Sequence, residues 1–332
     1  MIYFPKFEKI YFMWYYRRPK EGDIMSAITE QIIESYGMLK DYLDSIVIGE
    51  ENAKDVLIAS LLCDTNSHIL LLGQPGTCKS TISNNLAQNF TSKKIFITSD
   101  LLPSDILEAL KSKEDLQDLQ LEELNRASGK VQSSLIETLG DNKINGMTDD
   151  PETPGFYVMA TQNDSEISGI FDVPMAIYDR FDVNITLGNL TEEELEQVLF
   201  EYRVKIQKAK FDLNKCVNTT SKIIDDFVFT KEDRRVFMDS RKEIDTYLYL
   251  NRTKLFGSSN IRGHFFAIRM ATFHALAHGR DWIMPDDIAD YVSNIYLHRI
   301  NQTIVKMNDE KALNAMNEIE NNILSKVKRK EK

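Results

Sequence analysis

The chain has 332 residues, of which 42% are hydrophobic and 27% are charged, and its formal net charge is −11. This composition is that of a globular protein with about two domains and enough apolar residues for a core. The acidic balance argues against a protein that coats nucleic acid through its overall field, and three widely spaced cysteines predict neither a disulfide framework nor a zinc site and favour a reducing, cytoplasmic setting.

Residues 1–25 form an aromatic-rich segment that is expected to be an N-terminal extension. This extension need not be ordered. Its longest uncharged run, residues 10–16, is far too short to span a bilayer, and the layout of a secretory signal peptide is missing. A family-specific extension, or sequence upstream of a start at Met25, is favoured over a membrane-surface anchor. No later segment is apolar enough to cross a bilayer, so no membrane partner is expected.

The next segments alternate between helical and strand patterns. Residues 26–46 and 50–63 have apolar side chains at helical spacing. The run HILLL (68–72) reads as a buried parallel strand. It leads into GQPGTCKS (73–80) and then into a helix at residues 81–90. Strand, glycine-rich loop and helix in this order are the context that a phosphate-binding loop requires.

Further strands are expected at residues 94–98, 156–163 and 182–188, with helices and turns between them. This alternation predicts an α/β domain with a mainly parallel sheet over residues 26–188.

The character of the chain changes after residue 188. Thr191 and Glu194 have the spacing of a capping box that opens a helix. From there the apolar spacing is almost entirely helical, which predicts an all-helical domain over residues 189–332, ending in a basic tail.

The segment 73–80 matches the pattern G-x-x-x-x-G-K-[ST] except at Cys78, which stands where the second glycine belongs. Lys79 would bind the terminal phosphates and Ser80 would bind Mg²⁺, while backbone N–H groups face the phosphates. Cysteine is small and fits there if its backbone angles suit an L-residue. A sharper hypothesis is an oxidation-sensitive thiol, because a nearby lysine and a helix N-terminus lower a thiol pKa.

The segment LQLEELNRA (119–127) ends an expected strand with two acids. In ATPases that have such a phosphate-binding loop and two acids at the end of a core strand, the first acid holds the water shell of Mg²⁺ and the second polarises the attacking water. Glu122 and Glu123 are the candidates for these roles. The alternative is an ordinary charged helix, which the segment alone would favour.

Three further polar residues follow in order. Asn163 ends a strand and could sit between the γ-phosphate and the water, or it could merely mark a turn. Arg180 could reach the phosphate of a neighbouring subunit, or pair at the surface with Asp179 or Asp182. Arg262 could reach back to the nucleotide, or be a solvated residue at a helix start. The order and spacing of all these pieces are those that an AAA+ ATPase requires.

The chain resembles the MoxR family of AAA+ ATPases, including RavA-type proteins, over about residues 46–300. The resemblance rests on SDLLPSDI (99–106), EELNRASGKVQSSLIETL (122–139), VMATQND (158–164), DVPMAIYDRFDV (172–183) and GRDWIMPDDI (279–288). It implies an AAA+ P-loop domain followed by a helical lid. MoxR-type loops commonly carry alanine just before the lysine, so Cys78 exchanges one small residue for another.

The resemblance also implies roles for individual residues. Glu123 is the base, Asn163 is sensor 1, Arg180 is the arginine finger and Arg262 is sensor 2. Ile48 and Gly49 would line the adenine pocket. The residues expected to bind ATP are Ile48, Gly49, Gly73, Pro75, Gly76, Thr77, Cys78, Lys79, Ser80 and Thr81, and those expected to hold Mg²⁺ are Ser80 and Glu122.

Two departures from the family pattern bear on hydrolysis and remodelling. The first acid is Glu122 where the family has aspartate, and the strand leading to it is unusually polar for a buried parallel strand. The stretch between residues 106 and 122 is also short, so the family's β-hairpin insert is expected to be truncated or absent.

The resemblance implies a ring-forming ATPase, a hexamer by expectation, that remodels or matures a protein client. Such proteins often work with a partner that carries a von Willebrand factor A domain. Two alternatives stay open: an ATP-binding scaffold with little or no hydrolysis, motivated by Glu122, and a DNA-acting AAA+ motor, which the net charge disfavours. His274 and His278 have metal-site spacing on a helix, but without an evident third ligand they are interpreted as surface or core residues.

Overall fold

The fold is taken from a computed structural model, which describes residues 24–111, 116–141, 156–163, 169–188, 190–200, 207–250, 261–299 and 310–326. The chain forms two compact units. The α/β unit is formed by the described residues within 41–53 and 65–215, and the helical unit by the described residues within 24–40, 54–64 and 216–326. Among the described residues, no helix has both the length and the apolar character that crossing a membrane demands.

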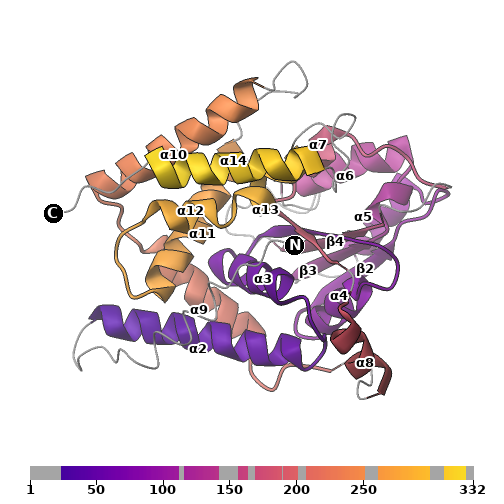
Figure 1. The fold of residues 1–332 in the computed structure, drawn as a ribbon. Coiled ribbons are helices and arrows are strands. Elements are labelled where there is room, and N and C mark those ends of the chain that lie inside the picture. The colour runs from indigo at the N-terminus through magenta and orange to yellow at the C-terminus, as the bar shows by residue number, and fades with distance from the viewer. Residues whose placement is uncertain are drawn as a thin grey trace. The chain divides into compact units, whose positions relative to one another are not determined.

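The α/β unit is built on five parallel strands in the order β2-β3-β4-β1-β5 (Figure 1). The strands are β1 (His68–Leu72), β2 (Ser92–Phe96), β3 (Asp118–Glu122), β4 (Tyr157–Gln162) and β5 (Val183–Thr186). Every residue of β1, β3 and β4 is buried. The parallel sheet predicted from the alternation of elements is therefore confirmed.

The register of the strands aligns their carboxyl ends. Leu72 is level with Gln162 of β4 and with Thr186 of β5, and Leu121 is level with Ala160. The loops that leave β1, β3 and β4 therefore start at one edge of the sheet, which is where open parallel sheets bind their ligands.

Helices of the α/β unit connect and cover these strands. They are α4 (Lys79–Ala87), α5 (Pro103–Lys111), α6 (Gly129–Asp141), α7 (Met175–Tyr178) and α8 (Glu192–Phe200), with a 3₁₀ turn η1 (Leu124–Arg126) after β3. Helix α4 packs against β3 and β4, and α5 packs against β2 and α6. Thr191 and Glu194 form the predicted capping box at α8: the Thr191 N–H donates to Glu194 Oε2 at 2.7 Å, and the Glu194 N–H donates to Thr191 Oγ1 at 3.2 Å.

The helical unit contains the C-terminal helices α9 (Leu213–Asp225), α10 (Lys231–Leu250), α11 (Ile261–Ala277), α12 (Pro285–Ala289), α13 (Val292–Tyr296) and α14 (Glu310–Lys326), and the turn η2 (Leu297–Arg299). It also includes most of α2 (Ile24–Asp44) and α3 (Glu51–Cys63). A helical unit was predicted from the spacing after residue 188, and its helices are present.

The division between the units differs from the expected boundary at residues 188 and 189. Most of α2 and α3 belongs with the C-terminal helices: Thr29 Oγ1 donates to the Leu276 carbonyl at 3.1 Å, and Arg269 Nε donates to the Cys63 carbonyl at 2.8 Å. Helical spacing in a sequence shows which face is buried but not which partner buries it. The expectations for residues 1–23, for the basic tail beyond residue 326 and for part of the hairpin region (112–115) lie outside the described residues.

Candidate nucleotide-binding site

The loop between β1 and α4 has the backbone of a phosphate-binding loop. Gly73 has φ +151°, and a Cβ at this position would lie 2.7 Å from both the Leu187 carbonyl oxygen and Thr77 Oγ1. Gly76 has φ +87°, which is a left-handed conformation that glycine adopts at little cost. Pro75 and Gly76 form the exposed turn itself. Glycine is therefore required at these two positions for physical reasons.

Lys79 is directed onto this loop. Its Nζ donates to the carbonyls of Gly73 at 2.7 Å and Gln74 at 2.6 Å, and to Thr77 Oγ1 at 3.3 Å. A primary ammonium group held by loop oxygens is the cation that would neutralise bound phosphates. Thr81 follows in the first turn of α4 and is partly buried, and its carbonyl accepts from Asn85 Nδ2 at 2.9 Å.

Cys78 stands in the left-handed region, with φ +61° and ψ +7°, at the N-cap of α4. This conformation costs a side-chain-bearing residue about 1 kcal/mol, so cysteine occupies the position at a cost. The surroundings of the thiol do not favour the alternative of an acidic, oxidation-sensitive cysteine. Burial and then the Glu50 carboxylate raise the pKa of Cys78, and Lys79 opposes them only in part.

The strain at Cys78 gives a stability prediction. Cys78→Gly should raise the free energy of unfolding by about 0.5–1 kcal/mol, because glycine relieves the left-handed strain while adding some unfolded-state entropy. Cys78→Ala keeps the strain and is the matched control. Urea unfolding monitored by circular dichroism measures both variants, and an equal gain in both would contradict the backbone explanation.

The two acids at the end of β3 have different surroundings. Glu122 is buried, and its Oε2 accepts hydrogen bonds from Ser80 Oγ at 2.9 Å and Thr161 Oγ1 at 2.8 Å. Burial favours the neutral form, but hydrogen bonds from Lys94, Thr161 and Ser80 and the charge of Lys94 together lower the pKa of Glu122. The carboxylate is therefore ionised beside Ser80, with its oxygens in fixed directions.

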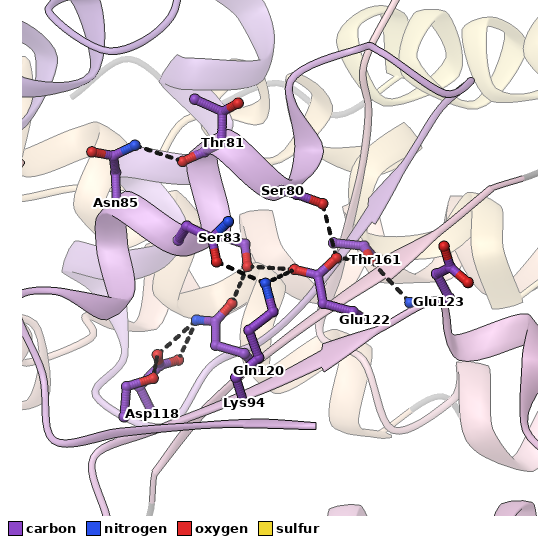
Figure 2. Close-up of polar contacts among 12 residues, drawn as sticks. Ser80, Thr81, Ser83, Asn85, Lys94, Asp118, Gln120, Glu122, Glu123 and Thr161 are labelled. Carbon is purple, nitrogen blue, oxygen red and sulfur yellow. Dashed lines mark hydrogen bonds and ion pairs between the residues drawn. The ribbon is translucent and has the colours of Figure 1, made fainter. Parts of the chain in front are cut away.

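The polar character of β3 is explained by one face of the strand (Figure 2). Asp118, Gln120 and Glu122 alternate along it, and Ser83 of α4 donates to both Gln120 Oε1 and, at 3.0 Å, Glu122 Oε1. Gln120 Nε2 donates to Asp118 Oδ1 at 2.8 Å, and Ser92 Oγ donates to Asp118 Oδ2 at 2.6 Å. The polar groups of this buried strand satisfy one another, as buried polar groups must.

Glu123 faces away from this network. Its backbone is left-handed (φ +62°), its N–H donates to Thr161 Oγ1 at 3.1 Å, and its carboxylate pairs with Arg126. About half of the side chain (51%) is exposed. Figure 2 shows its carboxylate apart from that of Glu122. A turn in the backbone thus sends one acid toward Ser80 and presents the other to solvent.

Asn163 comes directly after β4 and is partly buried. Its carbonyl accepts a hydrogen bond from Asn125 Nδ2 at 2.8 Å, which ties the end of β4 to the turn that follows Glu123. Asn163 and Glu123 therefore leave neighbouring strands at the same edge of the sheet. Sequence analysis did not single out Asn125, whose long-range contact has no local pattern.

The segment 48–50 lies against the same loop. Gly49 and Glu50 have φ +71° and +60°, and the charge of Glu50 acts on Cys78. A Cβ on Gly49 would meet the carboxylate end of the flexible Glu194 side chain, which would have to shift, and the positive φ of Gly49 itself favours glycine. Ile48 precedes it and is partly buried. Glu194 is a residue that sequence analysis recognised only as a helix cap.

Comparisons with known proteins agree with this geometry. The family described as "ATPase family associated with various cellular activities (AAA)" matches residues 68–183, and an "AAA lid domain" matches residues 252–320. The chaperone MoxR1 of Mycobacterium tuberculosis is 29% identical over 80% of this chain and 75% of its own length. The protein YeaC of Bacillus subtilis is 28% identical over 79% of this chain and 85% of its own length.

Together these matches support a MoxR-family AAA+ ATPase. A crystal structure of a candidate ATPase from Cytophaga hutchinsonii superposes on this chain with a TM-score of 0.67, at 25% identity, over 91% of this chain and 98% of the other. The α/β fold with a helical lid is thereby confirmed.

The backbone of Arg180 lies at the opposite end of β1 from the phosphate loop. Its carbonyl is 3.0 Å from His68 Nδ1 at the start of β1, whereas the loop begins at the other end of that strand. Four strand steps separate the two ends by roughly 13 Å. The Arg180 guanidinium is 3.9 Å from Asp179, a long ion pair, and Asp182 instead accepts from the His68 N–H at 2.9 Å. The role of Arg180 as an arginine finger stays a prediction.

Arg262 is the second residue of α11 in the helical unit and is partly buried. Its sensor role stays a prediction, since the phosphate loop belongs to the α/β unit.

The helical unit also contains the two histidines. His274, His278 and Asp287 have ligand atoms within 4.8 Å of one another, so a third group exists that the sequence did not reveal. Asp287 is already bound, however: Arg280 Nη1 donates to its Oδ2 at 2.8 Å and Arg280 Nη2 to its Oδ1 at 2.5 Å. Burial and the neighbouring His274 lower the pKa of His278 to about 4. A guanidinium on the carboxylate favours a structural cluster over a cation site.

Proposed function

We propose that this chain couples ATP binding and hydrolysis, at the interfaces of a ring of identical subunits, to the remodelling or maturation of a protein client. The observation that carries the proposal is the hydrogen bond between Ser80 Oγ and Glu122 Oε2. It joins the phosphate loop to the acid at the end of β3, which is the pairing that a magnesium-dependent nucleotide site needs.

The donor set fits Mg²⁺. A serine hydroxyl and an ionised carboxylate 2.9 Å apart are hard oxygen ligands, which this cation prefers, with water completing its shell. When bound, Mg²⁺ neutralises charge on the phosphates. Ser80 would hold it directly, and Glu122 would hold its water shell.

The other residues divide the reaction between them. The loop N–H groups and Lys79 would bind the β- and γ-phosphates. Glu123 would orient the attacking water and accept its proton, for which its carboxylate must leave Arg126. Asn163 would position the same water. Ile48 and Gly49 would contact adenine, and Arg262 would report on the nucleotide to the lid.

Arg180 would act on the site of a neighbouring subunit. The separation of its backbone from the loop along β1 supports this, because a head-to-tail ring interface joins two different surface patches, so a residue remote from its own loop can meet the loop of the next subunit. A hexamer is the ring size we propose. A von Willebrand factor A partner and a cytoplasmic setting are likewise proposed from the family resemblance and composition alone.

Mixing two inactive variants tests the shared site. Glu123→Gln removes the base and Arg180→Ala removes the finger, so each alone should hydrolyse ATP at background rates. In an equal, randomly mixed ring, about one quarter of the sites pair an intact Glu123 with a neighbour's intact Arg180, so the mixture should regain roughly a quarter of wild-type turnover. Steady-state phosphate release measures it.

The mixture also separates the alternatives. If it stays inactive while each variant still binds a fluorescent ATP analogue, Arg180 does not act between subunits. If wild type binds the analogue and never exceeds background turnover, the chain is an ATP-gated scaffold. Salt-sensitive binding to duplex DNA would instead favour a DNA-acting motor.

A further inference from the structure

The carboxylate of Glu122 is held from two sides (Figure 2). Ser80 and Thr161 donate to Oε2, as described above. The other oxygen, Oε1, accepts from Ser83 Oγ at 3.0 Å and forms an ion pair with Lys94 Nζ, also at 3.0 Å. One oxygen therefore faces the phosphate loop, and the other faces a lysine that no part of the proposed reaction uses.

Lys94 reaches Glu122 because of the strand register. In the parallel pair of β2 and β3, Lys94 is level with Gln120 and Phe96 with Glu122. The Lys94 side chain lies over the same face as Gln120 and Glu122 and extends to the carboxylate. Lys93, its neighbour in the strand, must point to the opposite face by the period-two alternation of strands.

The ammonium group of Lys94 is itself fixed. It donates to Asn84 Oδ1 of α4 at 2.7 Å and lies 4.7 Å from the centroid of the Phe96 ring. The Glu122 side chain is 5% exposed and that of Lys94 is 25% exposed. Solvent therefore screens this pair far less than a pair on the open surface.

The length of the acid decides what this arrangement can do. A glutamate spans the gap between the hydroxyls of Ser80 and Thr161 and the ammonium of Lys94. An aspartate at residue 122 is one methylene shorter and could not keep both sets of contacts from the same backbone position. A glutamate without an anchor on Oε1 has an additional torsion about which its Oε2 can turn away from Ser80.

We propose that Lys94 is a positioning residue for Glu122: by holding Oε1, it turns Oε2 toward Ser80 and makes the longer acid competent to hold the shell of Mg²⁺. The inference rests on the proposed function. Lys94 acts through Glu122 alone. Glutamate at residue 122 and lysine at residue 94 are therefore a matched pair.

The experiment compares Lys94→Met with Lys94→Arg, and Lys93→Met is the matched control on the other face of β2. Three quantities are measured. The first is the affinity for a fluorescent ATP analogue in EDTA, and the second is the free Mg²⁺ concentration at which the Mg²⁺-dependent change in that affinity is half complete. The third is the rate of ATP turnover. Lys94→Met should raise the half-saturating Mg²⁺ and lower turnover by about 10-fold each, as loss of a partner that orients a metal's ligand commonly does. The affinity in EDTA should stay within about twofold, because Lys94 has no role in holding phosphate.

The controls isolate the role of Lys94. Lys94→Arg keeps charge and reach and should restore most of the Mg²⁺ affinity, and Lys93→Met should behave as wild type. In a Glu122→Asp background, Lys94→Met should add less than about a twofold loss, since the shorter acid has already lost the contact. Should Lys94→Met fail to fold, as judged by circular dichroism, Lys94→Gln takes its place with the same expected result.

Several results would overturn the inference. If Lys94→Met lowered the free Mg²⁺ concentration needed for half-saturation, Lys94 would be a cation that competes with Mg²⁺ for the Glu122 carboxylate. If the loss of Mg²⁺ affinity in the double variant equalled the product of the losses in Lys94→Met and Glu122→Asp, the two residues would act independently. Wild type that binds the analogue and Mg²⁺, with Lys94 variants unchanged, refutes the role of Lys94 and leaves the proposed function standing. Wild type that binds no nucleotide refutes both.

Discussion

Glu123→Gln should lower ATP turnover by about 10²–10⁴-fold, the usual contribution of a general base, while nucleotide affinity stays near that of wild type. The amide keeps the size of the side chain but cannot accept the proton of the attacking water. The backbone contacts that place residue 123, namely its N–H on Thr161 Oγ1 and the left-handed turn, do not depend on the carboxylate.

The fold should tolerate this substitution. The ion pair with Arg126 is lost, but the Glu123 side chain is 51% exposed, and exposed pairs contribute about 0–1 kcal/mol. Phosphate release and analogue binding are measured on the same preparation. Lys79→Ala is the contrasting variant, which should lose binding as well as turnover, because its ammonium group is the cation on the loop.

An activity in Glu123→Gln within about threefold of wild type would remove Glu123 from the reaction, given the size expected of a base. The buried acid, Glu122, would not replace it as the base. Its ionised carboxylate lies against Ser80, Ser83, Thr161 and Lys94. Such an acid is well placed to hold a cation's shell and poorly placed to take up a proton.

The fold could be predicted because its signals are local. A buried run, a glycine-rich turn and a helix follow one another within 20 residues, and β1, the loop and α4 appear in that order. The parallel sheet followed from the alternation of elements. Glycine at residues 73 and 76 is explained by close approach and positive φ, which the pattern implied.

The rest depended on contacts between distant residues. The sequence indicated that β3 is unusually polar for a buried strand. Which side chains form hydrogen bonds and ion pairs with its polar groups, namely Ser83, Ser92 and Lys94, depends on the register of β2 on β3 and on which face of α4 packs against β3. Cys78 looked harmless by size, and only its backbone angles reveal strain. Asp287 stands 13 residues from His274 and joins it through the fold of α11 on α12.

The lid depends on that last cluster, and Asp287→Asn should lower the free energy of unfolding by about 3–5 kcal/mol, the loss typical of breaking one partner of a buried charge pair. The Asp287 side chain is fully buried and accepts from both Nη atoms of Arg280, while the Met284 N–H donates to it at 2.6 Å, capping α12. His274 Nδ1 lies 2.6 Å from its Oδ1. An amide cannot accept all of these donors at once. Asp286→Asn, an exposed neighbour in the same helical turn, is the matched control and should change stability little.

The pH dependence distinguishes a lost charge pair from a simple packing defect. Burial opposes ionisation, but Arg280 and His274 lower the pKa of Asp287 to about 2, below its ordinary value near 4. A carboxyl group with a depressed folded-state pKa stabilises the protein above its unfolded pKa and loses that contribution as the pH falls toward the folded value. The difference in urea stability between wild type and Asp287→Asn should therefore be constant from pH 7 to about pH 5 and shrink below about pH 4. A difference that stays constant down to pH 3 would mean that the variant is destabilised by shape and hydrogen bonding alone, and that the charge on Asp287 does not hold α11 to α12.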